Sequence, residues 1–323
     1  MYINFSGNLN QESKKLITSE VEKRLSNLKI DTNFHIYFNL PVKNKLSPSE
    51  FNVLLLWEPQ AVYPWQFRSD VLADFDLVVP FSPWRASHLQ IENWVFHPYD
   101  FSHVNPASIK FVERDIYISM INAAKFGAGQ TSNYGLRRKV IRKLFQEGID
   151  IKLYGSDWNI SRNMEIRKRF SAIRSSIVAG EKISISESLS SLFATYSMYS
   201  GQIPDKSSIL SRSQLHLVIE NDSDWVTEKI FDSFIHGAVP IYYGPEFKNF
   251  IPELEDCLIR IPSKEENIIK LVREISENVI VQKRRKISEL LTNKPLINQF
   301  QKEQVWSKVG RIIAGRFHEK KCI

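Results

Sequence analysis

The chain has 323 residues, of which 43% are hydrophobic and 24% are charged, and its formal net charge is +7. This composition excludes a disordered chain and is sufficient for two globular cores. The two cysteines, Cys257 and Cys322, exclude a disulfide framework and a cysteine-rich metal site. The chain starts without the apolar core of a signal peptide and contains no apolar run long enough to span a bilayer, so we expect a cytoplasmic protein.

The positive charge by itself is compatible with nucleic acid, an anionic membrane or a phosphate-bearing ligand. Much of it lies late in the chain, in residues 282–286 and 307–321. The second segment spaces its apolar residues as a helix would, with Lys and Arg on the other face: Val309, Ile312, Ile313 and Phe317. Such a helix could lie on a membrane surface as a peripheral contact, or it could pack on the protein as a solvated terminal helix.

The first hundred residues predict alternating strands and helices, the pattern of a parallel sheet with crossover helices. The expected strands are 3–5, 35–40, 51–57, 75–81 and 94–100, and the expected helices are 11–27 and 66–74. Residues 102–115 are polar and irregular enough to be a linker.

A second α/β unit follows the linker. Strands are predicted over residues 116–121, 149–155 and 215–221, and a helix over 132–144 with Ser132 or Asn133 as its cap. In residues 226–247 an amphipathic helix stops at Gly237, which is placed for a left-handed turn, and an apolar strand follows. In such sheets, ligands bind beyond the carboxyl ends of the strands.

Two carboxylates and a lysine lie around the start of that last helix. Glu220 ends the preceding strand, whereas Glu228 and Lys229 lie in the first helical turn. A helix N-terminus attracts anions, so Lys229 would help to bind a phosphate while the carboxylates would accept hydrogen bonds from ribose hydroxyls. The alternative is that Glu228 is a routine first-turn residue and that Lys229 is merely solvated.

Two other places could carry chemistry. Arg137, Arg138 and Lys139 lie near a predicted helix start, where they form either a second anion site or a solvated basic face. Glu58 directly follows the apolar run 51–57. If Trp57 desolvates this carboxylate, its pKa would rise toward the range of a general base; otherwise it is an exposed strand-end residue.

Metal and nucleic-acid sites receive little support. Residues 74–76 and 222–224 match Asp-x-Asp, but such tripeptides arise by chance, and Asp222 with Asp224 would more simply cap a helix. The seven histidines show no metal-ligand spacing. The chain has no Walker loop and no nucleic-acid recognition motif, so we expect neither a metal nor a nucleic-acid partner.

The stretch VTEKIFDSFIHGAVPIYYG, residues 226–244, resembles the signature of the α-1,3-fucosyltransferase family, glycosyltransferase family ten. VIEN at 218–221, SNYGLRRKVIRKL at 132–144 and WEP at 57–59 support the resemblance. It implies an α/β fold of the GT-B type, in which two Rossmann-like domains face a central cleft. The implied parts are an acceptor domain over 1–110, a donor domain over 111–295 and a basic helical segment over 296–323.

The resemblance also implies roles for individual residues. Glu58 would be the general base, Glu228 would bind the ribose and Lys229 the phosphate. Arg137 matches the diphosphate arginine, and Arg138 would replace it if the register slips by one. Trp225 stands where the family usually has tyrosine. The remaining implied donor-binding residues are Asn133, Glu220, Asn221, Trp225 and Thr227.

The implied reaction is inverting transfer of fucose from GDP-fucose to a glycan hydroxyl, with no cofactor and no obligatory metal. The acceptor would be a GlcNAc-type sugar of a lipopolysaccharide or capsule, joined in α-1,3 linkage. Two alternatives remain open. One is a similar transferase that uses another nucleotide-diphosphate sugar, and the other is a non-catalytic protein that binds glycans or nucleic acid.

Overall fold

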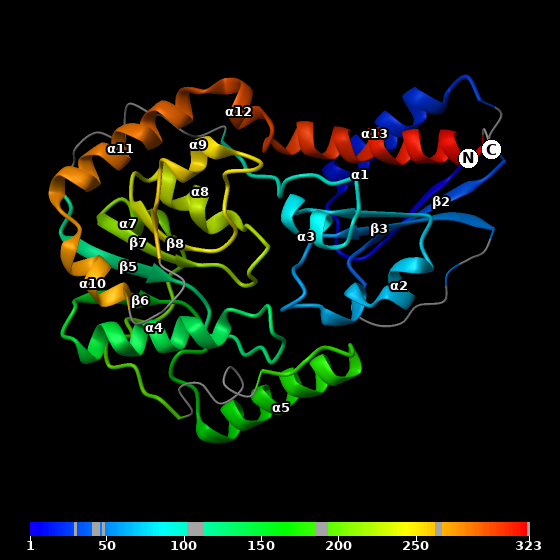
Figure 1. The fold of residues 1–323 in the computed structure, drawn as a ribbon. Coiled ribbons are helices and arrows are strands. Elements are labelled where there is room, and N and C mark those ends of the chain that lie inside the picture. The colour runs from blue at the N-terminus through cyan, green and yellow to red at the C-terminus, as the bar shows by residue number, and fades with distance from the viewer. Residues whose placement is uncertain are drawn as a thin grey trace. The chain divides into compact units, whose positions relative to one another are not determined.

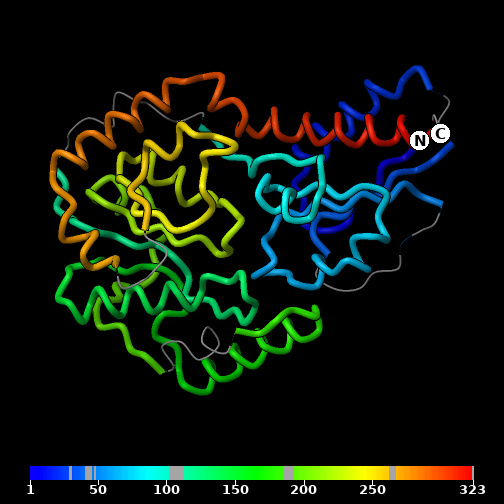
Figure 2. Tube along the Cα trace, in the orientation of Figure 1, coloured from blue at the N-terminus to red at the C-terminus, as the bar shows by residue number. Residues whose placement is uncertain are grey.

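The structure is a computed structural model, and the residues it describes are 1–28, 31–40, 46, 49–101, 113–184, 193–261 and 267–321. The chain divides into two compact units. The first contains residues 1–100, 178–180 and 298–323, and the second contains residues 101–177 and 181–297. Figure 2 traces the chain through both units.

The first unit is built on a four-stranded parallel sheet in the order β1-β2-β3-β4. Its strands are β1 (Ile3–Ser6), β2 (Asn33–Phe38), β3 (Glu50–Leu56) and β4 (Leu77–Pro80). β3 is buried on both faces, which explains why its sequence is an unbroken apolar run rather than an alternating one.

Helices cover this sheet (Figure 1). They are α1 (Gln11–Leu25), the 3₁₀ helix η1 (Pro64–Phe67), α2 (Ser69–Ala73), α3 (Pro83–His88) and α13 (Lys302–Lys321). Asn10 caps α1 by accepting a hydrogen bond from the Ser13 amide at 2.8 Å.

The C-terminal helix α13 is part of the first unit, not a segment of its own as the sequence suggested for 296–323. α13 packs along α1, and Val309, Ile313 and Phe317 are buried. The Phe317 ring lies 4.8 Å from the ring of Phe34 and 5.4 Å from that of Phe51. Of the apolar face that we considered for membrane contact, Val309, Ile313 and Phe317 therefore belong to the core, while Ile312 is half-buried.

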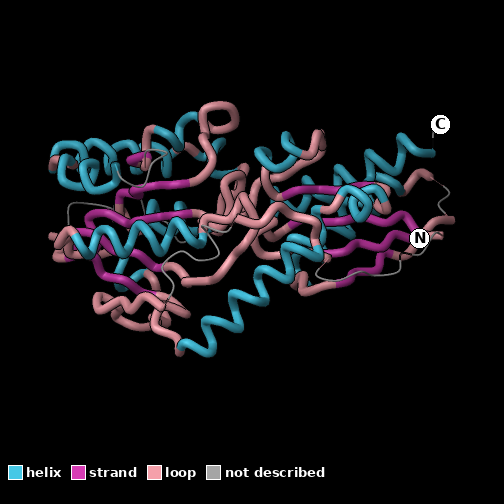
Figure 3. The backbone as a smooth tube through the Cα atoms, turned by 60° about the horizontal axis from the view of Figure 1, so that its bottom comes forward, coloured by secondary structure: helices cyan, strands magenta, loops and turns pink. Residues whose placement is uncertain are grey.

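The second unit contains a five-stranded parallel sheet in the order β6-β5-β7-β8-β9. Figure 3 draws the strands of each unit in magenta. Its strands are β5 (Ile116–Ile121), β6 (Ile151–Tyr154), β7 (Ser213–Ile219), β8 (Val239–Tyr243) and β9 (Ile259–Arg260). Its helices are α4 (Tyr134–Gln146), α5 (Arg162–Val178), α7 (Ser207–Leu210), α8 (Glu228–Ile235), α9 (Pro252–Glu255), α10 (Asn267–Glu274), α11 (Glu277–Thr292) and α12 (Lys294–Asn298).

The connections of this sheet run to opposite sides on either side of the β5–β7 pair, although all the strands are parallel. The chain leaves β5 for β6 on one side and then returns to β7 on the other side of β5. Crossovers that start from neighbouring strands and diverge leave a crevice at the carboxyl ends of those strands, which is where doubly wound sheets bind ligands. The sheet thus marks the ends of β5 and β7 as a candidate site.

The α/β fold with two Rossmann-like units is confirmed, and most strands lie where the apolar runs predict them. The strand predicted over 94–100 is wrong: this stretch has no regular structure, although the Val95 amide does reach the Pro80 carbonyl at 3.1 Å. Most of the expected linker, residues 102–112, lies outside the described residues. Among the helices that the structure describes, none has the length and hydropathy needed to cross a bilayer.

Candidate functional site

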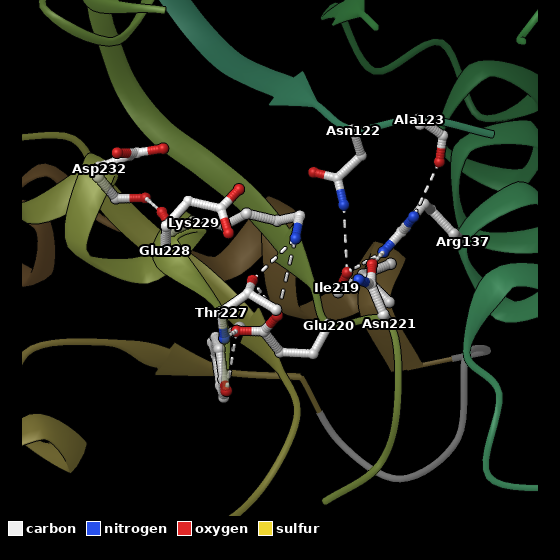
Figure 4. Close-up of polar contacts among 12 residues, drawn as sticks. Asn122, Ala123, Arg137, Ile219, Glu220, Asn221, Thr227, Glu228, Lys229 and Asp232 are labelled. Carbon is white, nitrogen blue, oxygen red and sulfur yellow. Dashed lines mark hydrogen bonds and ion pairs between the residues drawn. The ribbon is translucent and has the colours of Figure 1, made fainter. Parts of the chain in front are cut away.

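The candidate site lies in the second unit, at the carboxyl ends of β5 and β7 (Figure 4). Asn122 directly follows β5, and Glu220 and Asn221 directly follow β7. The N-termini of α4 and α8 are reached from the ends of these same strands. The structure therefore brings together the two motifs, 132–144 and 226–244, that the sequence singled out separately.

The loop that enters α4 is bonded to the loop that leaves β7. The Asn133 amide donates to the Asn221 carbonyl at 3.1 Å, and the Ser223 amide donates to the Thr131 carbonyl at 3.1 Å. The Asp222 carboxylate accepts from the Thr131 hydroxyl at 3.1 Å and from the Ser223 amide at 2.8 Å. Asp222 thus joins the two loops, a role different from the helix cap that the sequence suggested.

Glu220 is a buried structural carboxylate. Its side chain is fully buried and accepts hydrogen bonds from the Thr227 amide at 3.1 Å, the Thr227 hydroxyl at 2.6 Å and the Tyr242 hydroxyl at 3.4 Å. Burial raises its pKa. The expectation that Glu220 faces the crevice and binds a sugar hydroxyl is wrong, because both of its oxygens are engaged inside the protein.

Gly244 is required beside this carboxylate. A Cβ at position 244 would lie 2.8 Å from Cγ of Glu220 and 2.5 Å from the Tyr242 hydroxyl oxygen. The second glycine of the motif therefore leaves room for the packed Glu220 and Tyr242 side chains.

Lys229 lies against the same carboxylate. Its Nζ donates to Oγ1 of Thr227 at 2.8 Å and is 4.0 Å from Oε2 of Glu220, and 12% of its side chain is exposed. Figure 4 shows the side chain reaching toward both partners. The alternative of a merely solvated lysine is wrong, because its ammonium offsets a buried negative charge.

Glu228 forms a different ion pair. Lys206 Nζ is 3.4 Å from its Oε1 and 2.7 Å from Oδ2 of Asp232, one turn further along α8. The Glu228 side chain is 43% exposed. The adjacent glutamate and lysine at the start of α8 thus serve two ion pairs, and only Glu228 keeps substantial solvent contact.

Arg137 is 1% exposed and bonds to backbone carbonyls. Its terminal nitrogens donate to the Ala123 carbonyl at 2.8 Å, the Ile219 carbonyl at 2.6 Å and Oδ1 of Asn221 at 3.1 Å. Burial lowers its pKa to about 10, so the guanidinium remains charged at neutral pH. It ties α4 to the ends of β5 and β7, and its terminal nitrogens are already occupied.

Arg138 is likewise buried. It donates to the carbonyls of Tyr134, Ala124 and Lys125, and its guanidinium lies 3.8 Å from the centroid of the Phe126 ring. Burial lowers its pKa to about 10 as well. The idea of a solvated basic face is wrong for these two arginines, which brace the loop after β5.

Several buried polar atoms have no hydrogen-bond partner among the described residues, and three of them lie at the residues of the switch point. They are Nε of Arg137, Nδ2 of Asn133 and Oδ1 of Asn122. Leaving a buried polar atom unsatisfied typically costs about 1–3 kcal/mol, so such atoms call for an explanation. Two of the three are donors beside the N-terminus of α4.

The other implied donor residues are buried or half-buried in the same region. Trp225 is fully buried, so it does not offer an exposed aromatic face, and Thr227 is 7% exposed because it bonds to Glu220 and Lys229. Asn221 is half-buried beside Arg137. Asn122, Tyr242 and Lys206 were missed by the sequence reasoning, although the place of Asn122 directly after a predicted strand could have indicated it.

Glu58 belongs to the first unit, two residues beyond the end of β3, and it is half-buried. Oδ1 of Asn39 accepts its amide at 3.0 Å, and the buried Gln66 donates to its carbonyl at 3.1 Å. The preceding Trp57 stacks on Trp306 at 5.6 Å between ring centroids. The backbone that carries Glu58 is therefore held by polar bonds and by an aromatic cluster.

Within the described ranges, no group of three or more His, Cys, Asp or Glu residues is arranged to hold a metal ion. Of the two Asp-x-Asp tripeptides, 222–224 is buried at its aspartates, and Asp76 accepts from the Asn52 amide and pairs with Lys320. Metal-independent chemistry stays a prediction.

No protein-family model and no curated protein sequence matches this chain. Among solved structures, a glycosyltransferase from Rickettsia africae is 11% identical with a TM-score of 0.50, covering 98% of each chain. Anabaena HepE in complex with UDP-glucose is 11% identical with a TM-score of 0.51, covering 99% of this chain and 100% of that one.

An α,α-trehalose-phosphate synthase (UDP-forming) from Burkholderia vietnamiensis is 9% identical with a TM-score of 0.51, covering 98% of this chain and 80% of the other. At these identities the likeness shows the fold, which is the GT-B type expected from the sequence. This likeness does not show membership of the fucosyltransferase family.

Proposed function

We propose that this chain is a glycosyltransferase that moves a sugar from a nucleoside diphosphate to a hydroxyl group of an acceptor. The observation that carries the proposal is the switch point of the second unit, where two helix N-termini adjoin the ends of β5 and β7. Backbone N–H groups and the helix dipole favour an anion there, and the Lys229 ammonium adds a positive charge. The fold shared with the structures above supports this class of reaction.

For the donor, we propose GDP-fucose, and for the acceptor a GlcNAc-type glycan joined in α-1,3 linkage. The support is the motif at 226–244 together with the segments at 132–144 and 57–59. A UDP-sugar is the second candidate, because HepE is in complex with UDP-glucose and the trehalose-phosphate synthase is UDP-forming.

The proposed chemistry is a single displacement at the anomeric carbon. The acceptor oxygen forms the new C–O bond as the bond to the diphosphate breaks, and Glu58 takes the acceptor proton. The N-termini of α4 and α8, with Lys229, stabilise the charge that grows on the departing diphosphate. The terminal nitrogens of Arg137 already donate to backbone carbonyls, so Arg137 contributes to diphosphate binding through its positive charge. Its Nε–H could in addition donate to an oxygen of the diphosphate.

A thermal-shift panel of GDP, UDP, ADP and CMP tests the proposal. A ligand at a hundred times its dissociation constant adds about 2.7 kcal/mol to the free energy of unfolding. We expect GDP to give the largest shift. A larger shift with UDP would overturn the GDP-fucose assignment in favour of the second candidate, whereas no shift with any nucleotide would contradict the glycosyltransferase proposal itself.

Transfer must then be separated from mere binding. Incubation with GDP-fucose and GlcNAc-terminated glycans should release GDP and yield a fucosylated product visible by mass spectrometry. Tight nucleotide binding without product from any nucleotide sugar would instead support a non-catalytic binding protein.

A further inference from the structure

Helix α5 lies at the edge of the second unit (Figure 1). Its buried side chains are mainly polar, whereas several of its apolar side chains are exposed. The inward side chains include Glu165, Arg169 and Ser176, all of them buried. Glu165 and Arg169 form an ion pair at 2.6 Å, and Glu165 also accepts from the Phe193 amide at 3.2 Å. The buried face of α5 thus contains an ion pair, whereas the buried face of an ordinary surface helix is apolar.

The outward face is formed by the α5 stripe, which we define as Ile166, Phe170, Ile173 and Ile177. Steps of four, three and four residues place these side chains on one helical face. Ile166 is 39% exposed, Phe170 is 68% exposed and Ile177 is 60% exposed, while Ile173 is half-buried. Contiguous exposed apolar side chains of this size mark an interaction surface.

The exposed charges on α5 itself are all of one sign. Arg162, Arg167 and Arg174 are exposed on α5, and the single acid of this helix, Glu165, is buried in its pair with Arg169. Helical geometry places Arg167 and Arg174 on the same edge of the stripe, two turns apart. A partner for this face must therefore be apolar at its centre and anionic at its rim.

We infer that the α5 stripe rests on an anionic lipid surface, with Phe170 and Ile177 in the acyl boundary and the arginines at the phosphate level. An apolar face bordered by Arg is the chemistry of interfacial helices. A second copy of the chain fits less well, because a symmetric contact between two α5 helices brings like charges together.

This inference moves the expected membrane contact away from the C-terminus. The apolar residues of α13 are buried against the first unit's sheet and α1, so that helix cannot offer them to lipid. α5 already exposes its apolar residues in the folded state. Binding through α5 therefore requires no unfolding.

Vesicle co-sedimentation of the full chain tests the inference. The vesicles contain phosphatidylglycerol with phosphatidylcholine, and pure phosphatidylcholine vesicles serve as the comparison. We expect the wild-type chain to pellet with the anionic vesicles and the double variant Phe170→Ser/Ile177→Ser to bind them at least about tenfold more weakly, because most of the buried apolar area is gone. The variant Arg167→Gln/Arg174→Gln should bind more weakly and depend less on salt.

Phe145→Ser is the matched control, since Phe145 is 49% exposed on α4 of the same unit. It should bind as the wild type does. Circular dichroism and the melting temperature verify that each variant is folded.

Three results would overturn the inference. They are a wild-type chain that stays in the supernatant, α5 variants that pellet as well as Phe145→Ser does, and a wild-type dimer in light scattering that Phe170→Ser/Ile177→Ser dissociates. The last outcome would assign the stripe to contact between copies of the chain.

Discussion

Replacing Lys229 with methionine should destabilise the second unit in a pH-dependent way. The substitution keeps the length of the side chain but removes the ammonium that lies 4.0 Å from Oε2 of Glu220. The carboxylate stays fully buried, held only by the hydrogen bonds from Thr227 and Tyr242. Removing one partner of a buried ion pair typically costs about 3–5 kcal/mol, because the other charge is left uncompensated.

Protonation of Glu220 limits this loss. The carboxyl has an ordinary pKa of 4.5, so keeping it protonated at pH 7 costs about 3.4 kcal/mol, at about 1.4 kcal/mol per pH unit. At pH 5 the same cost is only about 0.7 kcal/mol. In the variant, burial without Lys229 raises the folded-state pKa further, so the stability that this group contributes is fully present below pH 4.5 and is lost progressively as the pH rises from 4.5 to the raised folded-state pKa.

Urea unfolding of Lys229→Met at pH 5, 6 and 7, followed by fluorescence of Trp158 and Trp225 in the second unit, measures this effect. We expect a loss of about 3 kcal/mol relative to the wild type at pH 7 and of about 1 kcal/mol at pH 5. Adding Glu220→Gln should restore most of the stability at pH 7, because the amide carries no charge, its oxygen can still accept from the Thr227 backbone N–H, and its NH2 group can donate to the Thr227 hydroxyl. Nucleotide affinity should stay weak in the double variant, which separates the structural role of Lys229 from its ligand role. A loss that is equal at pH 5 and pH 7, or no loss at pH 7, would refute the reasoning.

Four further outcomes are expected. Glu58→Gln should lower kcat by about a hundredfold to ten-thousandfold with unchanged GDP affinity; a variant that retains half of the wild-type kcat would move the base elsewhere. Transfer should persist in EDTA, and a strict requirement for Mn²⁺ in the turnover assay would contradict this. Burial lowers the pKa of His216 to about 3, whereas in the unfolded chain the imidazole takes up a proton near pH 6.5. The free energy of unfolding of the wild type should therefore fall by about 2 kcal/mol between pH 7 and pH 5. In urea titrations, His216→Asn should remove this dependence on pH. Phe317→Ala should cost about 3–5 kcal/mol in the first unit because its ring packs in the core; a loss below about 1 kcal/mol would show that the α13 contact is weak.

The fold could be predicted from the sequence wherever apolar runs and glycines determine the backbone. Gly237 has φ of 67°, the left-handed turn that its place after Ile235 predicts, and β5 begins and ends where its apolar run does. Helix α5 was not predicted, because its apolar stripe faces outward and its core side is a charge pair. The stretch 94–100 has the residues of a strand but contains Pro98, which lacks the N–H that a sheet ladder needs.

For the candidate site, the sequence predicted where several charged residues lie but not what they contact. The sequence identified Glu220, Lys229 and Arg137 as charged residues near strand and helix ends, and the structure places all three around β7. What one sequence does not show is whether a charged group faces a ligand or another buried group. That depends on partners distant in sequence, such as Tyr242 for Glu220 and the Ile219 carbonyl for Arg137.

The pairing of α13 with α1 has a consequence for how the protein emerges from the ribosome. All four strands of the first unit have been synthesised once the ribosome has passed Pro80. The helix that contains Phe317 begins only at Lys302. At 5–20 residues per second, roughly ten to forty seconds separate the two. The second unit, nearly continuous from 101 to 297, is complete before then. The second unit can therefore fold before the first is complete. Until α13 has been synthesised, the sheet of the first unit leaves Phe34 and Phe51 uncovered. During this interval a chaperone can bind these exposed apolar side chains.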